Sequence, residues 1–363
     1  MSEASSGPKR EPPGWSRSLP PGILRAGDRL VRHTILLQRC FDGTQMRWSD
    51  ALVARMRRHA GGCISAAEMA LRLEIERQDT RIGQYVAALP EACCWNLIER
   101  HPPLIDPVLL AHFRDRAALS LMRQESSFSD PEAVAGREDK ALFPPTVIET
   151  LTTITLAQSG WADGGPDHVP MRLDIPAEVM AELVWTACSI IADALIRTSG
   201  LPKAEVLETV QAAGWAVLGR HDEQTGPFAM SALFAHQLRV IGPTEQQLLH
   251  LAREGHVLPL LAILGDRIGI ELLDLVRAVV EDAEPALFTL CRAADMPREV
   301  AVRLVLGRRS VARGVDDSML VQYADEYDLK APDAARESVA ELAMPQPLRD
   351  KLSLLHDWMT DEC

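Results

Sequence analysis

The sequence predicts an all-α protein, and three observations lead to this expectation. Apolar residues make up 47% of the chain while aromatic residues make up only 5%, a mixture that favours helices over sheets. Helix-opening signals recur along the chain, and apolar residues follow each one at helical spacing. We find no alternating strand pattern with hairpin turns. We therefore expect stacked helical hairpins, a HEAT-like or α-solenoid-like array, with no significant β-sheet.

Composition divides the 363 residues into consecutive segments. Residues 1–22 are rich in Ser, Pro and Gly, which predicts a disordered tail. An N-terminal helical region follows at 23–159, and 160–175 is a Gly/Pro-rich loop or linker. We expect a C-terminal helical region with weak repeats at 176–310 and acidic C-terminal helices at 311–363.

The first helices are predicted from their capping residues. Ser49 is the expected N-cap of a helix that stops at Gly61-Gly62. Ser65 and Glu68 have the spacing of a capping box, in which each side chain satisfies a free amide at the helix start. We therefore expect a second, long helix to begin there and to end before Pro90.

Later helices follow from similar signals. A short helix is expected at 91–99, and Asp106-Pro107 is a strong opener for the next one. Further helices are predicted at 146–158, 177–198, 203–218 and 228–240. Thr244 and Gln247 form another capping box.

The C-terminal region contains a weak internal repeat. Residues 258–264 align with 284–290, so that Pro259 matches Pro285 and Leu264 matches Leu290. In the helices that follow, Leu275 matches Leu304. This pattern favours stacked helix pairs that bury their apolar faces on one another.

Charge and apolar patterning exclude several classes of protein. The formal net charge is −13, whereas a nucleic-acid-binding domain normally carries a basic face. The most apolar stretch, 183–196, contains Thr186, Ser189 and Asp193, which indicates a buried helix rather than a membrane span. The N-terminus lacks the apolar core of a signal peptide. We therefore expect a soluble, cytoplasmic protein that binds neither membranes nor nucleic acid.

The seven cysteines include no C-x-x-C pair, so we interpret them as reduced thiols and expect neither a metal nor a cofactor. The adjacent Cys93 and Cys94 cannot both face one metal from a regular helix. His59 and Cys63 are close in sequence but have no second pair to complete four ligands.

One histidine–glutamate pair and one run of arginines are candidates for catalytic or binding roles. His250 and Glu254 stand four residues apart on one predicted helix, where they could hold a metal or transfer protons if a third partner joined them. A surface pair with no such role is the alternative that we favour. The run Arg47, Arg55, Arg57 and Arg58 is expected to form a solvated face, or else a docking patch.

The candidate binding site is a cluster of arginines around Gly307, made up of Arg303, Arg308, Arg309 and Arg313. Arginine binds carboxylates and phosphates through paired hydrogen bonds. The same cations could instead complement the C-terminal dipole of the preceding helix. A partner for the cluster could be an external acidic group or the chain's own acidic segment after residue 315.

Residues 244–307 resemble a bacterial family known as domain of unknown function 2336, common in alphaproteobacteria. The resemblance lies in Leu264-Gly265-Asp266, in the 284–287 segment Glu-Pro-Ala-Leu, and in the 291–297 segment Cys-Arg-Ala-Ala-Asp-Met-Pro. Residues 104–110 also resemble the family's N-terminal half. The resemblance implies an all-helical, partly HEAT-like fold and supplies no catalytic residues that could be carried over to this chain. The Gly-rich 160–174 segment and the acidic C-terminal tail depart from it.

Function is therefore open between two hypotheses. The first is a non-enzymatic scaffold or regulatory adaptor that binds another protein, because stacked helices present extended surfaces. The alternative is an enzyme or small-molecule sensor with a site between helices near His250 and Glu254, or near Arg308.

Overall fold

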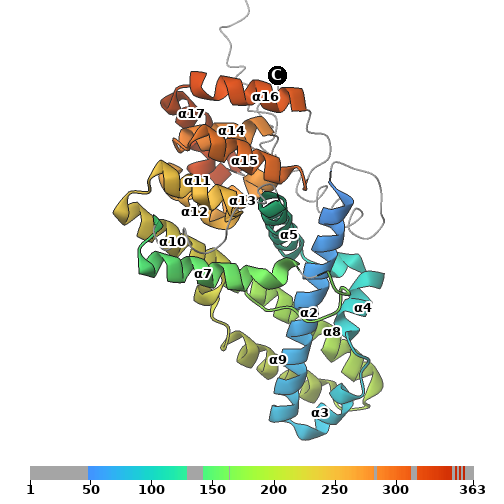
Figure 1. Ribbon diagram of the computed structural model, residues 1–363. Coiled ribbons are helices and arrows are strands. Elements are labelled where there is room, and N and C mark those ends of the chain that lie inside the picture. Colours follow the sequence, from blue (N-terminus) through green and yellow to red (C-terminus); the bar gives the residue numbers. More distant parts are fainter. Residues whose placement is uncertain are drawn as a thin grey trace, which may run out of the picture.

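The computed structural model describes residues 48–128, 142–162, 164–281, 284–311, 317–345, 348–349, 351–352 and 355. Over these ranges the chain is built from helices and short 3-10 turns, with no β-strand (Figure 1). The predicted all-α fold is confirmed. The tail predicted at 1–22 lies outside the described residues.

The helices follow one another through short connections. Those of the first half are α2 (Asp50–Gln78), α3 (Thr80–Ala87), α4 (Cys93–Arg100), α5 (Pro107–Phe128) and α7 (Pro145–Ser159). Those of the second half are α8 (Ala177–Thr198), α9 (Lys203–Leu218), α10 (Pro227–Ile241), α11 (Glu245–Arg253), α12 (Val257–Ile268), α13 (Leu272–Glu281), α14 (Glu284–Ala293), α15 (Arg298–Arg308), α16 (Asp317–Glu326) and α17 (Pro332–Val339).

Helix α2 is one continuous helix where the sequence predicted two. Ser49 is its N-cap, and the Ser49 hydroxyl accepts a hydrogen bond from the Leu52 amide at 3.1 Å. The predicted stop at Gly61-Gly62 and the predicted start at Ser65 are wrong, because all three residues are buried inside the helix. A Cβ on Gly61 would lie 2.5 Å from the Asp167 carbonyl oxygen. The glycine therefore permits close packing of the 160–175 segment rather than ending the helix.

The helix that was predicted to continue to residue 89 is interrupted after Gln78. Asp79 leaves the helical conformation, and its carboxylate accepts hydrogen bonds from the amides of Arg81 and Ile82. Asp79 is thus the N-cap of α3, a role for which aspartate is well suited. The sequence analysis missed this cap because apolar residues keep a helical spacing on both sides of Asp79, from Ile75 to Ile82.

Most of the other opening signals are confirmed. The Asp106 carboxylate accepts a 2.7 Å hydrogen bond from the Val108 amide at the start of α5. Thr244 and Gln247 form the predicted capping box of α11, each side chain bonding the other's backbone amide. The helices predicted at 177–198 and 203–218 coincide with α8 and α9.

Helix α5 lies at the centre of the fold. It packs against α2 from the first half of the chain and against α8, α11, α12, α13 and α15 from the second half, so it joins the two halves (Figure 1). Around it, α2 also packs on α3, α8 and α9, while α10 packs between α7 and α12. This central position explains why α5 is buried on several faces.

Helix α8 is long and apolar enough to cross a membrane by length and composition. Within the fold, 61% of its apolar window is buried, and it packs against α9, α2, α4 and α5. The core helix of a globular fold passes the same test, and the packing agrees with the buried helix that the sequence predicted.

The C-terminal helices form consecutive pairs. Helix α12 packs on α13, and α14 packs on α15. The residues aligned by the predicted repeat, Leu264 with Leu290 and Leu275 with Leu304, are all buried. A regular repeat array stays a prediction, although the helix pairs that it requires are present.

Candidate functional site

The predicted arginine cluster is divided by burial. Arg308 belongs to the last turn of α15, is only 4% exposed, and donates a 2.8 Å hydrogen bond from Nε to the Val279 carbonyl oxygen near the end of α13. Arg303 donates to the exposed Glu299 one turn earlier. Arg309 caps α15, and Arg313 lies outside the described residues. Arg308 therefore supports the packing of α13 and does not present its guanidinium at the surface.

The acidic C-terminal segment does fold back onto α15, but at a different arginine. Arg298, at the start of the helix, pairs with Asp325 at 3.5 Å and with Asp328 at 3.8 Å. All three side chains are about half exposed or more. Pairs of this kind contribute little to stability because water and salt screen them.

The structure places His250 in a ring contact and Glu254 at a helix end. The His250 ring packs 6.0 Å from the ring of Phe143, and Glu254 is the C-cap of α11. The ring contact joins α11 to the segment that precedes α7.

The arginines of α2 hold the Gly/Pro-rich segment in place. Arg55 and Arg58 donate hydrogen bonds to the carbonyl oxygens of Trp161 and Val169 at 2.7 and 2.8 Å. Arg57 pairs with Asp167 and with Glu99. The predicted solvated face is thus wrong for these three residues, and Arg47 lies outside the described part of the chain. The segment 160–175 is anchored to α2, which explains the glycines beneath it.

A buried cluster lies under this segment, between α2 and α5. Arg116 and Asp174 form an ion pair at 2.9 Å in which both side chains are 1% exposed. The Arg116 guanidinium also lies 4.9 Å from the centre of the Trp161 ring and donates to Cys63 Sγ. The Trp161 carbonyl oxygen lies 2.9 Å from Nε2 of His59. We call Arg116, Asp174, Trp161, His59 and Cys63 the polar junction.

Two buried histidines in this region are held neutral. Burial and the positive charge of Arg116 keep the pKa of His59 well below its ordinary value. Burial and the cations Arg116 and Arg277 lower the pKa of His112, which neighbours Phe113 and Phe228, from 6.5 to about 3. Desolvation disfavours the charged imidazolium in both cases. Neither histidine is placed to exchange protons with solvent near neutral pH, which indicates a structural role.

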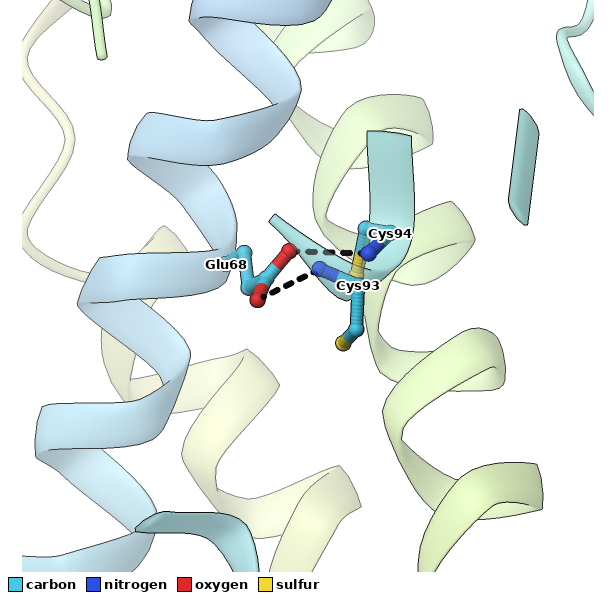
Figure 2. Close-up of side chains that lie close together, drawn as sticks. All are labelled: Glu68, Cys93 and Cys94. Atoms are coloured by element: carbon cyan, nitrogen blue, oxygen red, sulfur yellow. Dashed lines mark hydrogen bonds between the residues drawn. The ribbon is translucent and has the colours of Figure 1, made fainter. Parts of the chain in front are cut away.

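The second cluster joins α2 to the start of α4 (Figure 2). Glu68 is 2% exposed, and its carboxylate accepts hydrogen bonds from the Cys93 amide at 3.2 Å and the Cys94 amide at 2.9 Å. Arg72 donates to Glu68 Oε1 from both Nε and Nη2, at 2.9 and 2.7 Å. Glu68 therefore caps a helix start, as the sequence suggested, but the helix is α4 and not its own. We call Glu68, Arg72, Cys93 and Cys94 the thiol cluster.

The thiol cluster places sulfur, carboxylate and guanidinium groups together. One ligand-type atom from each of Glu68, Cys93 and Cys94 lies within 4.8 Å of the other two. The sequence argument against such a meeting assumed a regular helix, whereas Ala92 has a left-handed backbone (φ 51°) and the cysteines occupy the first turn of α4. Arg72 Nη2 lies 3.5 Å from Cys93 Sγ.

These contacts fit an anionic thiolate better than a metal ion. Both carboxylate oxygens of Glu68 already accept hydrogen bonds from α4 amides, and one of them also binds Arg72. A cation held by the two sulfurs would have to lie beside the Arg72 guanidinium. Like charges in such proximity repel each other strongly in a partly buried site.

The surface offers two further features. One is an open groove of about 510 Å³ between α2, α8 and the end of α9, with Leu73, Leu173, Met180 and Val217 among its lining residues. The other is a pair of tryptophans on α8 and α9. The Trp215 side chain is 60% exposed and meets Trp185 edge-on, with ring centres 4.9 Å apart.

The tryptophan pair depends on a glycine. A Cβ on Gly214 would lie 2.7 Å from the Trp185 ring. The absence of a side chain therefore lets Trp185 lie against α9 and support Trp215 from the side. The sequence analysis did not single out this pair, because the two residues are far apart in sequence and meet only when α8 packs on α9.

The described residues define an all-helical protein in which several ionisable groups, among them Arg116, Asp174 and Glu68, are buried at helix contacts. Residues 165–340 match a family model described as "Uncharacterised protein conserved in bacteria (DUF2336)". The resemblance predicted for 244–307 is thereby confirmed, and most of the Gly-rich segment and all of α16 and α17 lie inside the match. The match does not include residues 104–110. Comparisons with curated proteins and with solved structures found no match.

Proposed function

We propose that this chain is a non-enzymatic adaptor that binds another protein through the exposed tryptophan pair on α8 and α9. The carrying observation is the 60% exposure of Trp215. Tryptophan is strongly enriched among the residues that contribute most to protein–protein binding. A large exposed aromatic side chain held in a defined orientation is therefore suited to insert into an apolar pocket of a partner.

The fold supports a rigid presentation of this surface. Trp185 is pressed against α9 at Gly214, and α8 is a core helix that also contacts α2, α4 and α5. Little conformational freedom would be lost when a partner covers Trp215, because its neighbours are already ordered. Preorganisation of this kind improves affinity without additional contacts.

The alternative, an enzyme or small-molecule sensor, has weaker support. The groove has a volume typical of small-molecule sites, but His250, Glu254 and Arg308 do not line it. Most of its charged lining groups are engaged within the protein: Glu74 binds both Arg77 and Arg220, and His221 Nε2 lies 2.8 Å from the Ile175 carbonyl oxygen. A ligand would have to replace these pairs.

The cytoplasm is the proposed location of this adaptor. Among the described residues, Cys63, Cys93, Cys94, Cys188 and Cys291 are all free thiols. Free thiols are typical of reducing compartments.

The test compares Trp215→Ala with Leu156→Ala. Leu156 on α7 is 68% exposed, so both variants remove a large exposed side chain while leaving the core intact. Partners captured by the unmodified protein from its native host would be identified by mass spectrometry, purified, and titrated against each variant. We expect Trp215→Ala to weaken binding by about 30-fold, the loss typical of a dominant interface residue, and Leu156→Ala to have no effect.

Two results would contradict the proposal. One is equal binding by both variants. The other is that light scattering shows a homodimer which Trp215→Ala converts to a monomer, because the pair would then be covered by a second copy of the chain. Melting temperatures of both variants would show that the fold is retained.

A further inference from the structure

We propose that Cys93 is a reactive thiolate that hydroperoxides oxidise reversibly to a sulfenic acid, with Arg72 and Cys94 as the groups that stabilise it. This modification site is separate from the tryptophan pair and does not depend on the adaptor function. The proposal starts from the contrast between the two adjacent thiols. Cys93 is partly exposed, whereas Cys94 is fully buried with its sulfur facing the Ala187 carbonyl oxygen at 3.8 Å.

Three neighbours favour a negative charge on the Cys93 sulfur. The Arg72 guanidinium lies 3.5 Å away, and a cation beside a thiol stabilises the thiolate. Cys93 is the first residue of α4, so its sulfur lies at the positive end of the helix. The contact with the Cys94 thiol and the charge of Arg72 lower the pKa of Cys93 below its ordinary value, although burial and the neighbouring Glu68 carboxylate oppose them. The contact with Cys93 and burial raise the pKa of Cys94.

Arg72 is fixed in position by the protein and not by the thiolate alone. Its Nη1 donates to the Val86 carbonyl oxygen at 2.7 Å, and its Nη2 donates to the Pro90 carbonyl oxygen at 2.6 Å and to Glu68. A cation held by four or more contacts keeps its place whether Cys93 is a thiol, a thiolate or an oxidised sulfur. The same guanidinium can therefore stabilise the reactant and the sulfenate product.

The chemical step is a two-electron transfer from sulfur to a peroxide. The Cys93 thiolate attacks one oxygen of hydrogen peroxide or an alkyl hydroperoxide, forming an S–O bond as the O–O bond breaks. The leaving hydroxide or alkoxide takes a proton from solvent and departs as water or an alcohol. Sulfur is oxidised by two electrons and the peroxide is reduced by two. Two equivalents of a small external thiol reverse the step: the first forms a mixed disulfide with Cys93 and releases water, and the second releases the Cys93 thiol as the external thiols leave as their disulfide.

The folded state stops the reaction at the sulfenic acid. A disulfide between adjacent residues would have to close across one peptide unit, where a trans peptide holds the Cα atoms about 3.8 Å apart. Disulfides normally require about 4.4–6.8 Å. Because Cys93 and Cys94 also begin α4 and bind Glu68 through their amides, that ring would have to break the first turn. Cys94 therefore does not act as a resolving thiol for Cys93.

The test uses the full chain with hydrogen peroxide, a sulfenic-acid-specific dimedone probe and peptide mapping by mass spectrometry. We expect the probe on Cys93 and not on Cys63, Cys94, Cys188 or Cys291, which are all buried. Peptide mapping also separates Cys93 from Cys40 and Cys363. Arg72→Gln should slow labelling of Cys93 about tenfold, the effect of one pKa unit. Arg77→Gln, on the same helix at a 69% exposed side chain, is the matched control and should leave the rate unchanged.

A second measurement does not depend on any variant folding. The rate of alkylation of Cys93 by iodoacetamide, followed against pH in the unmodified protein, should have its midpoint below about 8.5, the ordinary thiol value. A midpoint at or above that value, or absence of the dimedone adduct, would overturn the proposal. So would protection of both Cys93 and Cys94 by one equivalent of Zn²⁺ per chain, because the cluster would then be a metal site.

Discussion

Arg114 and Arg116 of α5 and Arg303 of α15 are all helical arginines with acidic partners, but they lie in opposite environments in the structure. In α5, Arg114 pairs with Asp115 and Glu281, and Arg116 pairs with Asp174; both guanidinium groups are buried. In α15, the Arg303 side chain is 23% exposed and pairs with Glu299, whose side chain is 44% exposed. Water screens the second kind of pair, whereas burial makes the first kind sensitive to loss of either partner.

The difference shows that burial, not residue type, decides what a charged cluster does. The candidate cluster at Gly307 was selected because arginines gather there in sequence. Buried ion pairs are instead made by Arg114 and Arg116 on α5, where α2, α13 and the 160–175 segment cover the helix. Variants in the two regions should therefore differ in how much they change the free energy of unfolding.

The largest expected effect is at the polar junction. Arg116→Met should lower the free energy of unfolding by about 3–5 kcal/mol, because Asp174 would remain as a buried carboxylate without a cation. Denaturant titration followed by circular dichroism measures this. Adding Asp174→Asn should recover part of the loss, since the amide still offers an acceptor to Trp161 Nε1. A single-variant loss below about 1 kcal/mol would remove the distinction between the two arginine groups.

The next effect concerns pH. His112 has a pKa of about 3 in the folded state against an ordinary value of 6.5, and that of His59 is also lowered. Between those values the unfolded chain binds protons that the folded chain does not. The stabilisation is therefore complete above pH 6.5 and is lost as pH falls, by about 1.4 kcal/mol per pH unit for His112, with a further loss in the same direction from His59.

The variant His112→Leu separates this contribution from that of the carboxylates. Between pH 6 and pH 4, its free energy of unfolding should fall less steeply than that of the unmodified protein, by about 1.4 kcal/mol per pH unit. Denaturant midpoints at several pH values provide the measurement. Parallel slopes for the two proteins would show that the pKa of His112 is not lowered in the folded state.

A smaller effect is expected when alanine replaces a glycine, and its sign should depend on whether the new Cβ meets another segment. Gly61→Ala should lower the free energy of unfolding by about 1–3 kcal/mol, because its Cβ would meet the Asp167 carbonyl oxygen. Gly160→Ala has no heavy atom within 4 Å of the new Cβ and should be neutral or raise stability by up to about 1 kcal/mol. Thermal melts of both variants test this, and a stabilising Gly61→Ala would contradict the packing explanation.

The smallest effect is expected at α15. Arg303→Ala should change the free energy of unfolding by about 0–1 kcal/mol, and added salt should reduce even that difference. Denaturation at low and high ionic strength is the measurement. A loss comparable to that of Arg116→Met would show that the exposed pair is as important as the buried one.

Several elements of the fold were predictable because their signals are local. Asp106 and Thr244 cap the helices that follow them through hydrogen bonds to amides two and three residues away. The apolar periods at 177–198 and 203–218 coincide with α8 and α9. In each case the residues that determine the helix are its own, so no knowledge of distant segments is required.

The errors in α2 have a tertiary cause. Gly61-Gly62 is a typical helix stop, and Ser65 with Glu68 is a typical start, when only neighbours in the sequence are considered. In the structure the glycines accommodate the backbone near Asp167 and the side chain of Met171. Glu68 binds the amides of Cys93 and Cys94, about 25 residues away. Contacts between distant segments thus override both local signals.

The sequence by itself determined that the chain is helical, where most helices begin, and its resemblance to a bacterial family over 244–307. These properties follow from capping residues and apolar periodicity, which act within a few residues. Only the tertiary structure decided which charges are buried, which thiol is exposed and where two tryptophans meet on the surface. Burial and electrostatic environment arise from the packing of α2, α5, α8 and α9, and they change the energy of a charge far more than its neighbours in sequence do.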